Sequence, residues 1–111
     1  MRHITAKMLS RPLNNLELAD EAKEDIRDIA AYTLRTYGEL QADSYVDDIY
    51  NTLIAIQYNP LIGHFRVDLP EEYKAMISGR HVIVYTFKQA CVYVARILHD
   101  RMDIPHHFPR Y

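Results

Sequence analysis

The sequence predicts an α+β domain in which a helix hairpin packs on a small, mostly antiparallel sheet, in the order β-α-α-β-β-β. Residues 20–58 hold two apolar stripes at helical spacing, separated only near Gly38. Residues 80–87 and 91–98 are rich in β-branched and aromatic side chains, which favour strands. A short alternating segment, residues 16–19, precedes the helices and supplies a first strand.

Composition is that of an ordinary soluble domain. The 111 residues are 49% hydrophobic and 25% charged, which argues against disorder and suits one domain. No apolar run approaches the roughly 18 residues that cross a membrane, and residues 1–15 lack the apolar centre of a secretory signal. The single cysteine, Cys91, excludes an internal disulfide and is typical of a reducing cytosol. We expect a cytoplasmic protein with an N-terminal extension (1–15) and one domain (16–111).

The two helices are predicted from their stripes and their ends. Asp20 is placed to cap the first helix, and Gly38 supplies the left-handed residue that ends it. The second runs over residues 39–58, because Asn59 precedes Pro60 and is disfavoured in the α region. A link this short makes an antiparallel hairpin with both stripes facing one layer. The stripe of the first helix comprises Ala22, Ile26, Ile29, Ala30, Thr33 and Tyr37.

Three strands in a meander complete the predicted sheet. Residues 60–72 contain two prolines and a glycine and indicate an irregular crossing loop. Residues 73–77 favour a strand, which is followed by a tight turn at residues 78–79. The apolar runs 80–87 and 91–98 are then the second and third strands of the meander.

Charge is divided unevenly along the chain. Residues 20–59 hold nine acidic and three basic side chains, whereas residues 73–111 hold two acidic and six basic ones. We therefore expect the two halves to face different partners. With a net charge of −2 and a pI near 6.3, the chain is a poor candidate for wrapping nucleic acid.

Three stretches of sequence occur in a characteristic order. They are ADEAKEDIRDIAAYTLRTYG at 19–38, YNPLIG at 58–63, and GRHVIVYTF with VARILHDRMD within 79–103. Together they resemble the ParE/RelE superfamily of toxins from type II toxin–antitoxin modules, and the ILHDRMD ending is similar to the ParE branch. The resemblance covers roughly residues 16–107. It implies the ParE/RelE-like fold and a toxin that is neutralised by a cognate antitoxin.

The resemblance implies two alternative activities. ParE members inhibit DNA gyrase by binding it, whereas RelE members cleave mRNA on the ribosome, and a shared fold does not separate them. Cleavage requires a base, an acid and cations over the phosphate, and the modest positive charge of residues 73–111 argues against docking into rRNA. We therefore expect a gyrase inhibitor without catalytic residues. A degenerate toxin that only binds its antitoxin is a third possibility. A ribonuclease site would use Arg80, His81, Arg96, Arg101 and His107.

The polar stretch after the last strand is predicted to hold gyrase. Methionine adapts to apolar partners, arginine is favoured at interfaces, and the segment leaves the sheet at an exposed end. The predicted gyrase-inhibiting surface comprises Arg80, His99, Arg101, Met102, Asp103, Ile104 and Phe108.

The resemblance also implies a cognate antitoxin, ParD-like or otherwise DNA-binding, with a flexible tail that folds around the toxin. Such a tail needs apolar surface to offset its ordering, and we expect it to bind in the groove between the two helices or at the open sheet edge, there as an added strand. DNA would then be contacted only through the antitoxin. The predicted antitoxin-binding residues are Ile26, Ile29, Tyr32, Tyr50 and Ile54.

Several polar side chains also have a structural interpretation. His81 is equally well explained as a hydrogen-bonded structural histidine, and Arg96 as the partner of an acidic helix residue. Cys91 is expected to be a small buried hydrophobe. The histidines lack the i,i+4 pairing of a helical metal site, so we predict no metal and no cofactor.

Overall fold

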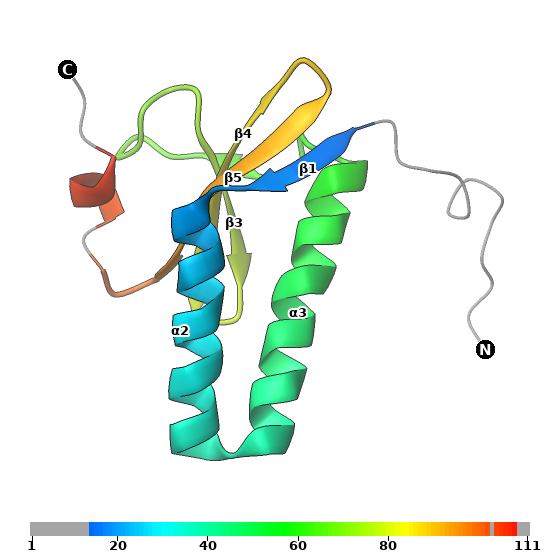
Figure 1. The fold of residues 1–111 in the computed structure, drawn as a ribbon. Helices are drawn as coiled ribbons and strands as arrows, with labels where there is room; N and C mark the ends of the chain where they lie inside the picture. The colour runs from blue at the N-terminus through cyan, green and yellow to red at the C-terminus, as the bar shows by residue number, and fades with distance from the viewer. Residues whose placement is uncertain (1–13, 103, 109–111) are drawn as a thin grey trace, which may run out of the picture.

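The computed structural model describes residues 14–102 and 104–108, and it confirms the predicted α+β order (Figure 1). Within the described residues, no helix is both long and apolar enough to span a membrane. The segment predicted as an irregular loop contains one additional strand of two residues. In chain order the elements are β1 (Asn15–Leu18), α2 (Asp20–Tyr37), α3 (Glu39–Tyr58), β2 (His64–Phe65), β3 (Lys74–Ser78), β4 (His81–Lys88), β5 (Cys91–His99) and the 3₁₀ helix η1 (Ile104–His107).

Helices α2 and α3 form the predicted hairpin, whose tip lies at the bottom of Figure 1. The prediction that Asp20 caps α2 is wrong, because Ala19 is the cap residue and no side chain bonds the helix start. Ala19 instead donates its N–H to Val94 O at 2.9 Å, so the chain leaves the sheet directly into the helix. At the other end Gly38, with φ 92°, donates its N–H to Leu34 O and separates α2 from α3.

The five strands lie in the order β1-β5-β4-β3-β2. Strand β1 runs parallel to β5, and all other neighbours are antiparallel. Val84 pairs with Arg96 and Tyr85 with Val94, so Ala95 is an extra residue that makes a bulge in β5. This bulge shifts the register of the second half of β5, which carries Arg96 and His99.

Each face of the sheet has its own hydrophobic core. Neighbouring residues on β4 alternate between the two cores, since Ile83 packs with the helix residues and Val82 and Val84 do not. The first core joins α2, α3 and the sheet through Ala22, Ile26, Ile29, Ile49, Leu53, Ile56, Ile83, Tyr85, Val92, Val94 and Ile97. The second core is covered by the 66–73 loop and η1, and it comprises Leu69, Ala75, Val82, Val84, Leu98, Ile104 and Phe108.

Candidate functional site

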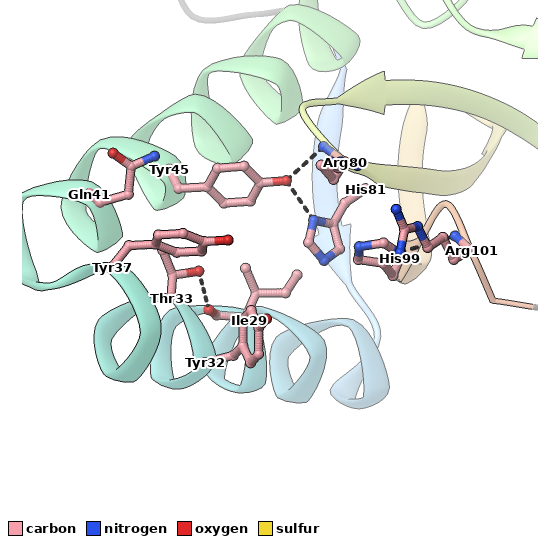
Figure 2. A pocket seen from close by; sticks show the side chains of 10 residues that line it. All are labelled: Ile29, Tyr32, Thr33, Tyr37, Gln41, Tyr45, Arg80, His81, His99 and Arg101. Atoms are coloured by element: carbon pink, nitrogen blue, oxygen red, sulfur yellow. Dashed lines mark hydrogen bonds between the residues drawn. The ribbon is translucent and has the colours of Figure 1, made fainter.

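A pocket of about 490 Å³ opens between the helix hairpin and the ends of β4 and β5 (Figure 2). The helices contribute tyrosines, and the sheet end contributes arginines and histidines. Among its described lining residues there is no carboxylate, although the chain as a whole is slightly acidic. The lining residues are Ile29, Tyr32, Thr33, Tyr37, Gln41, Tyr45, Arg80, His81, His99 and Arg101.

The hydroxyl of Tyr45 organises the sheet side of the pocket. It accepts the Arg80 N–H at 2.9 Å and lies 2.6 Å from His81 Nδ1. The alternative acceptor, Ser78 O, is 3.4 Å away, so the hydroxyl proton goes to Nδ1. His81 therefore carries its own proton on Nε2 when it is neutral. Gly79 permits this approach, because its φ is 58° and a Cβ there would lie 2.7 Å from the Tyr45 ring.

The two histidines face each other across neighbouring strands. His81 pairs with His99, and their ring centroids are 5.2 Å apart in an edge-on arrangement. Burial, and then the proximity of His99, lower the pKa of His81 below its ordinary value, which favours the neutral ring. His99 Nδ1 lies 3.1 Å from both the Arg101 N–H and Asp100 Oδ1. A neutral His99 accepts from Arg101 there, whereas a protonated ring donates to Asp100.

A second polar cluster lies around Arg96. Its guanidinium donates to both carboxylate oxygens of Asp25 on α2, each at 2.9 Å, which confirms that Arg96 pairs with an acidic helix residue. Asp25 also accepts the Ile97 N–H at 2.8 Å, beyond the point where β1 ends at Leu18. The hydrogen bond to Asp25 raises the pKa of Arg96 above its ordinary range. On the other side, His107 Nδ1 lies 3.3 Å from Arg96 Nη1.

Comparison with known proteins decides the family. The family described as "ParE toxin of type II toxin-antitoxin system, parDE" matches residues 16–104. The chain is 31% identical over 90 residues to Toxin ParE1 of Caulobacter vibrioides, covering 81% of this chain and 93% of that protein. This chain belongs to the ParE toxin family. It is also 26% identical over 88 residues to Toxin ParE1 of Mycobacterium tuberculosis, covering 78% and 90% of the two chains.

Solved structures show the ParE fold. The chain superimposes on a chain of a chromosomal ParDE toxin–antitoxin system from P. aeruginosa with a TM-score of 0.70 at 17% identity, covering 78% of this chain and 96% of that one. A YoeB dimer from Staphylococcus aureus gives a TM-score of 0.57 at 19% identity, with coverage of 78% and 97%. The predicted ParE branch and α+β architecture are therefore confirmed.

The residues predicted to hold gyrase divide into two groups in this ParE toxin. Arg80, His99 and Arg101 line the pocket, and Met102 follows them with 46% of its surface exposed. The prediction that Ile104 and Phe108 are exposed contacts is wrong: they are 2% and 8% exposed in the second core, because their apolar side chains cover the free face of the sheet. Asp103 lies outside the described residues.

The residues predicted to bind the antitoxin also divide. Tyr32, Tyr50 and Ile54 are 57%, 47% and 48% exposed. Ile26 and Ile29 are only 7% and 8% exposed and belong mainly to the first core, although Ile26 also lines a groove beside β1. The apolar stripe of an amphipathic helix packs first against its own sheet, so the centre of the stripe is covered and its flanks are more exposed.

The five residues named for a ribonuclease do not meet at one place. Arg80, His81 and Arg101 line the pocket, whereas Arg96 and His107 belong to the cluster around Asp25. Arg96 lies three residues before His99, which is the strand partner of His81. At about 3.3 Å per residue along a strand, the backbones of Arg96 and His99 are roughly 10 Å apart.

Two residues that organise these clusters were not among the predicted site residues. Tyr45 lies on α3, and Asp25 lies near the start of α2. Nothing local signals that Tyr45 meets the 78–81 turn or that Asp25 meets β5, because the contacting residues are 36 and 71 positions away.

Proposed function

We propose that this ParE toxin inhibits DNA gyrase by binding it at the mouth of the pocket, through Arg80, His99, Arg101 and Met102. Such inhibition needs a complementary surface that stabilises one state of the enzyme, and it needs no proton transfer by the toxin. The observation that carries the proposal is the exposure of Arg80, Arg101 and Met102 at one end of the sheet of a ParE-family chain. Arginine and methionine are both favoured at the centres of interfaces.

We further propose that the toxin is not an enzyme. The arrangement of the two polar clusters supports this, because Arg80 and Arg101 line the pocket, whereas Arg96 and His107 lie around Asp25. The charge of Arg96 is moreover already paired with Asp25 in a bidentate contact. A cation held in this way is a weak candidate for stabilising a developing phosphate charge.

The cognate antitoxin is proposed to bind beside β1. A groove there is lined by Leu16, Leu18 and Tyr50, among others. The N–H groups of Asn15 and Ala19 donate to Ala90 O, just before β5, and to Val94 O in β5. The alternate residues Leu16 and Leu18 therefore direct their backbone groups toward the open edge. An extended antitoxin segment would add to this edge as a strand. The structural neighbour is described as a ParDE toxin–antitoxin system, which supports the proposal that a toxin of this fold pairs with an antitoxin.

A gyrase supercoiling assay tests the proposed activity. The double variant Arg80→Glu/Arg101→Glu is expected to lose inhibition by at least about tenfold, because it reverses two interface charges. Lys88→Glu, at the opposite end of β4, is the matched control and is expected to inhibit normally. Both variants should still bind the antitoxin.

Two results would contradict the proposal. One is full inhibition by the charge-reversed variant. The other is cleavage of mRNA at ribosomes that disappears on His107→Ala, which would establish the ribonuclease alternative.

The antitoxin site is tested separately by titration of the antitoxin against Tyr50→Ala/Ile54→Ala. These side chains are about half exposed, so their removal should weaken the complex while leaving inhibition of gyrase unchanged. If this double variant bound the antitoxin with unchanged affinity, the proposed site beside β1 would be wrong.

A further inference from the structure

The pocket of Figure 2 has two chemically different ends. Arg80, Arg101 and His99 lie at the sheet end, whereas Tyr32 and Tyr37 lie at the helix end. No carboxylate is among the described lining residues, although Asp100 Oδ1 lies 3.1 Å from Nδ1 of the lining residue His99. Two other grooves in the described part of the chain are lined in part by glutamate or aspartate, which distinguishes them from this pocket.

The sheet end presents donors rather than acceptors. The guanidinium groups of Arg80 and Arg101 carry only N–H donors, and planar guanidinium is well matched to phosphate oxygens. The Tyr45 hydroxyl occupies His81 Nδ1, so the remaining ring nitrogen of His81 is a donor as well. These groups can surround a phosphate without any change in protonation.

The helix end presents flat apolar surface beside polar tips. Tyr32 and Tyr37 are 57% and 66% exposed, although each lines the pocket together with Ile29. Exposed tyrosine rings of this kind serve as stacking platforms for bases, and base–aromatic stacking adds to binding whatever the base. The amide of Gln41 is also at this end and can pair with a base edge.

We propose that this pocket binds a nucleoside monophosphate, with its base against Tyr32 and Tyr37 and its phosphate on Arg80 and Arg101. The volume of about 490 Å³ lies within the usual 300–1,000 Å³ of small-molecule sites. A carboxylate from an acidic peptide would satisfy the arginines but would leave the tyrosine rings without a flat partner. Nucleotide binding here needs no gyrase and goes beyond the proposed function, although it uses Arg80 and Arg101, which also belong to the proposed gyrase-binding surface.

Isothermal titration of the full-length toxin with adenosine monophosphate tests the proposal in the absence of gyrase. Inorganic phosphate and adenosine serve as the two halves of the ligand. The nucleotide is expected to bind at least about tenfold more tightly than either half, because it engages both ends of the pocket. Arg101→Ala and Tyr37→Ala are each expected to weaken binding by about tenfold. Both side chains are exposed, so neither change threatens folding.

Matched controls lie outside the pocket. Lys88→Ala removes a cation at the far end of β4, and Tyr93→Ala removes an exposed ring from β5. Both are expected to bind the nucleotide as the unaltered chain does. Equal weakening by these controls would overturn the assignment of the ligand to the pocket.

Four further results would overturn the proposal. They are the absence of binding up to millimolar nucleotide, inorganic phosphate binding as tightly as the nucleotide, tighter binding of a glutamate-rich peptide, and tighter binding of a single-stranded oligodeoxyadenylate. The last two would assign the pocket to a protein partner or to a nucleic acid strand. Because the titration contains no gyrase, its outcome is separate from that of the supercoiling assay.

Discussion

Arg96 of β5 and Asp25 of α2 form a bidentate ion pair that ties the helix hairpin to the sheet across 71 positions of sequence. Their side chains are 25% and 12% exposed, so water screens the pair only in part. Asp25 also accepts the Ile97 N–H, where the parallel strand β1 has already ended. One carboxylate therefore anchors a helix and completes the hydrogen bonding of a strand edge.

Replacement of this carboxylate should destabilise the fold. Asp25→Asn leaves Arg96 partly buried without its counter-charge and weakens the bond to Ile97. We expect a loss of about 2–4 kcal/mol in the free energy of unfolding, measured by urea denaturation. Glu24→Gln is the matched control, since the Glu24–Arg27 pair is 61% and 66% exposed and should leave the midpoint unchanged. Similar midpoints for the two variants would show that the Arg96 pair adds no stability.

The tail should contribute to stability through its buried aromatic ring rather than its exposed methionine. Phe108 packs on Tyr73 with ring centroids 4.9 Å apart. Phe108→Ala is expected to lower the free energy of unfolding by about 3 kcal/mol, because it opens a cavity in the second core. Met102→Ala, at a side chain 46% exposed, should change it little. Thermal unfolding of both variants measures these effects. An unchanged midpoint for Phe108→Ala would show that packing of the C-terminal segment adds no stability.

The hydroxyl of Tyr45 should stabilise the turn at Gly79. Tyr45→Phe removes the acceptor of the Arg80 N–H and the donor to His81 Nδ1. The expected loss is about 1–2 kcal/mol in the free energy of unfolding, as for one or two net hydrogen bonds. Tyr37→Phe is the control, because the Tyr37 side chain is 66% exposed. Equal stability of the two variants in urea would contradict a structural role for the Tyr45 hydroxyl.

Stability should fall with acid in a window set by His81. Its folded pKa is lowered below the ordinary 6.5 by burial and by His99, against smaller opposing effects of Asp100 and Asp25. Below about 6.5 the unfolded chain therefore binds more protons, so stability is complete above that pH and declines as pH falls toward the folded pKa. Urea midpoints compared at about pH 7.5 and 5.5 should fall less for His81→Gln than for the unaltered chain. An identical decline would assign the acid sensitivity to other groups.

The elements of the fold were predictable because their signals are local. The stripes of α2 and α3 have the period of an amphipathic helix, and the apolar runs of β4 and β5 have the composition of strands. The errors occur where a tertiary contact overrides a local rule. Asp20 is not the cap of α2, because Ala19 is still bonded to β5. The two-residue strand β2 forms only because β3 is present to pair with it.

The sequence by itself determined the order of the elements, the ParE family and the presence of cations near the C-terminal end. These signals are local, because hydrophobic periodicity and sequence motifs are carried by residues close together in the chain. Only the tertiary structure decided which side chains converge. The register of β4 against β5 brings Arg80 and His81 beside His99, and the hairpin brings Tyr45 onto them. Phe108 is likewise buried only in the folded chain, where it packs on the sheet face that the helices leave uncovered. Covering this apolar face removes it from water.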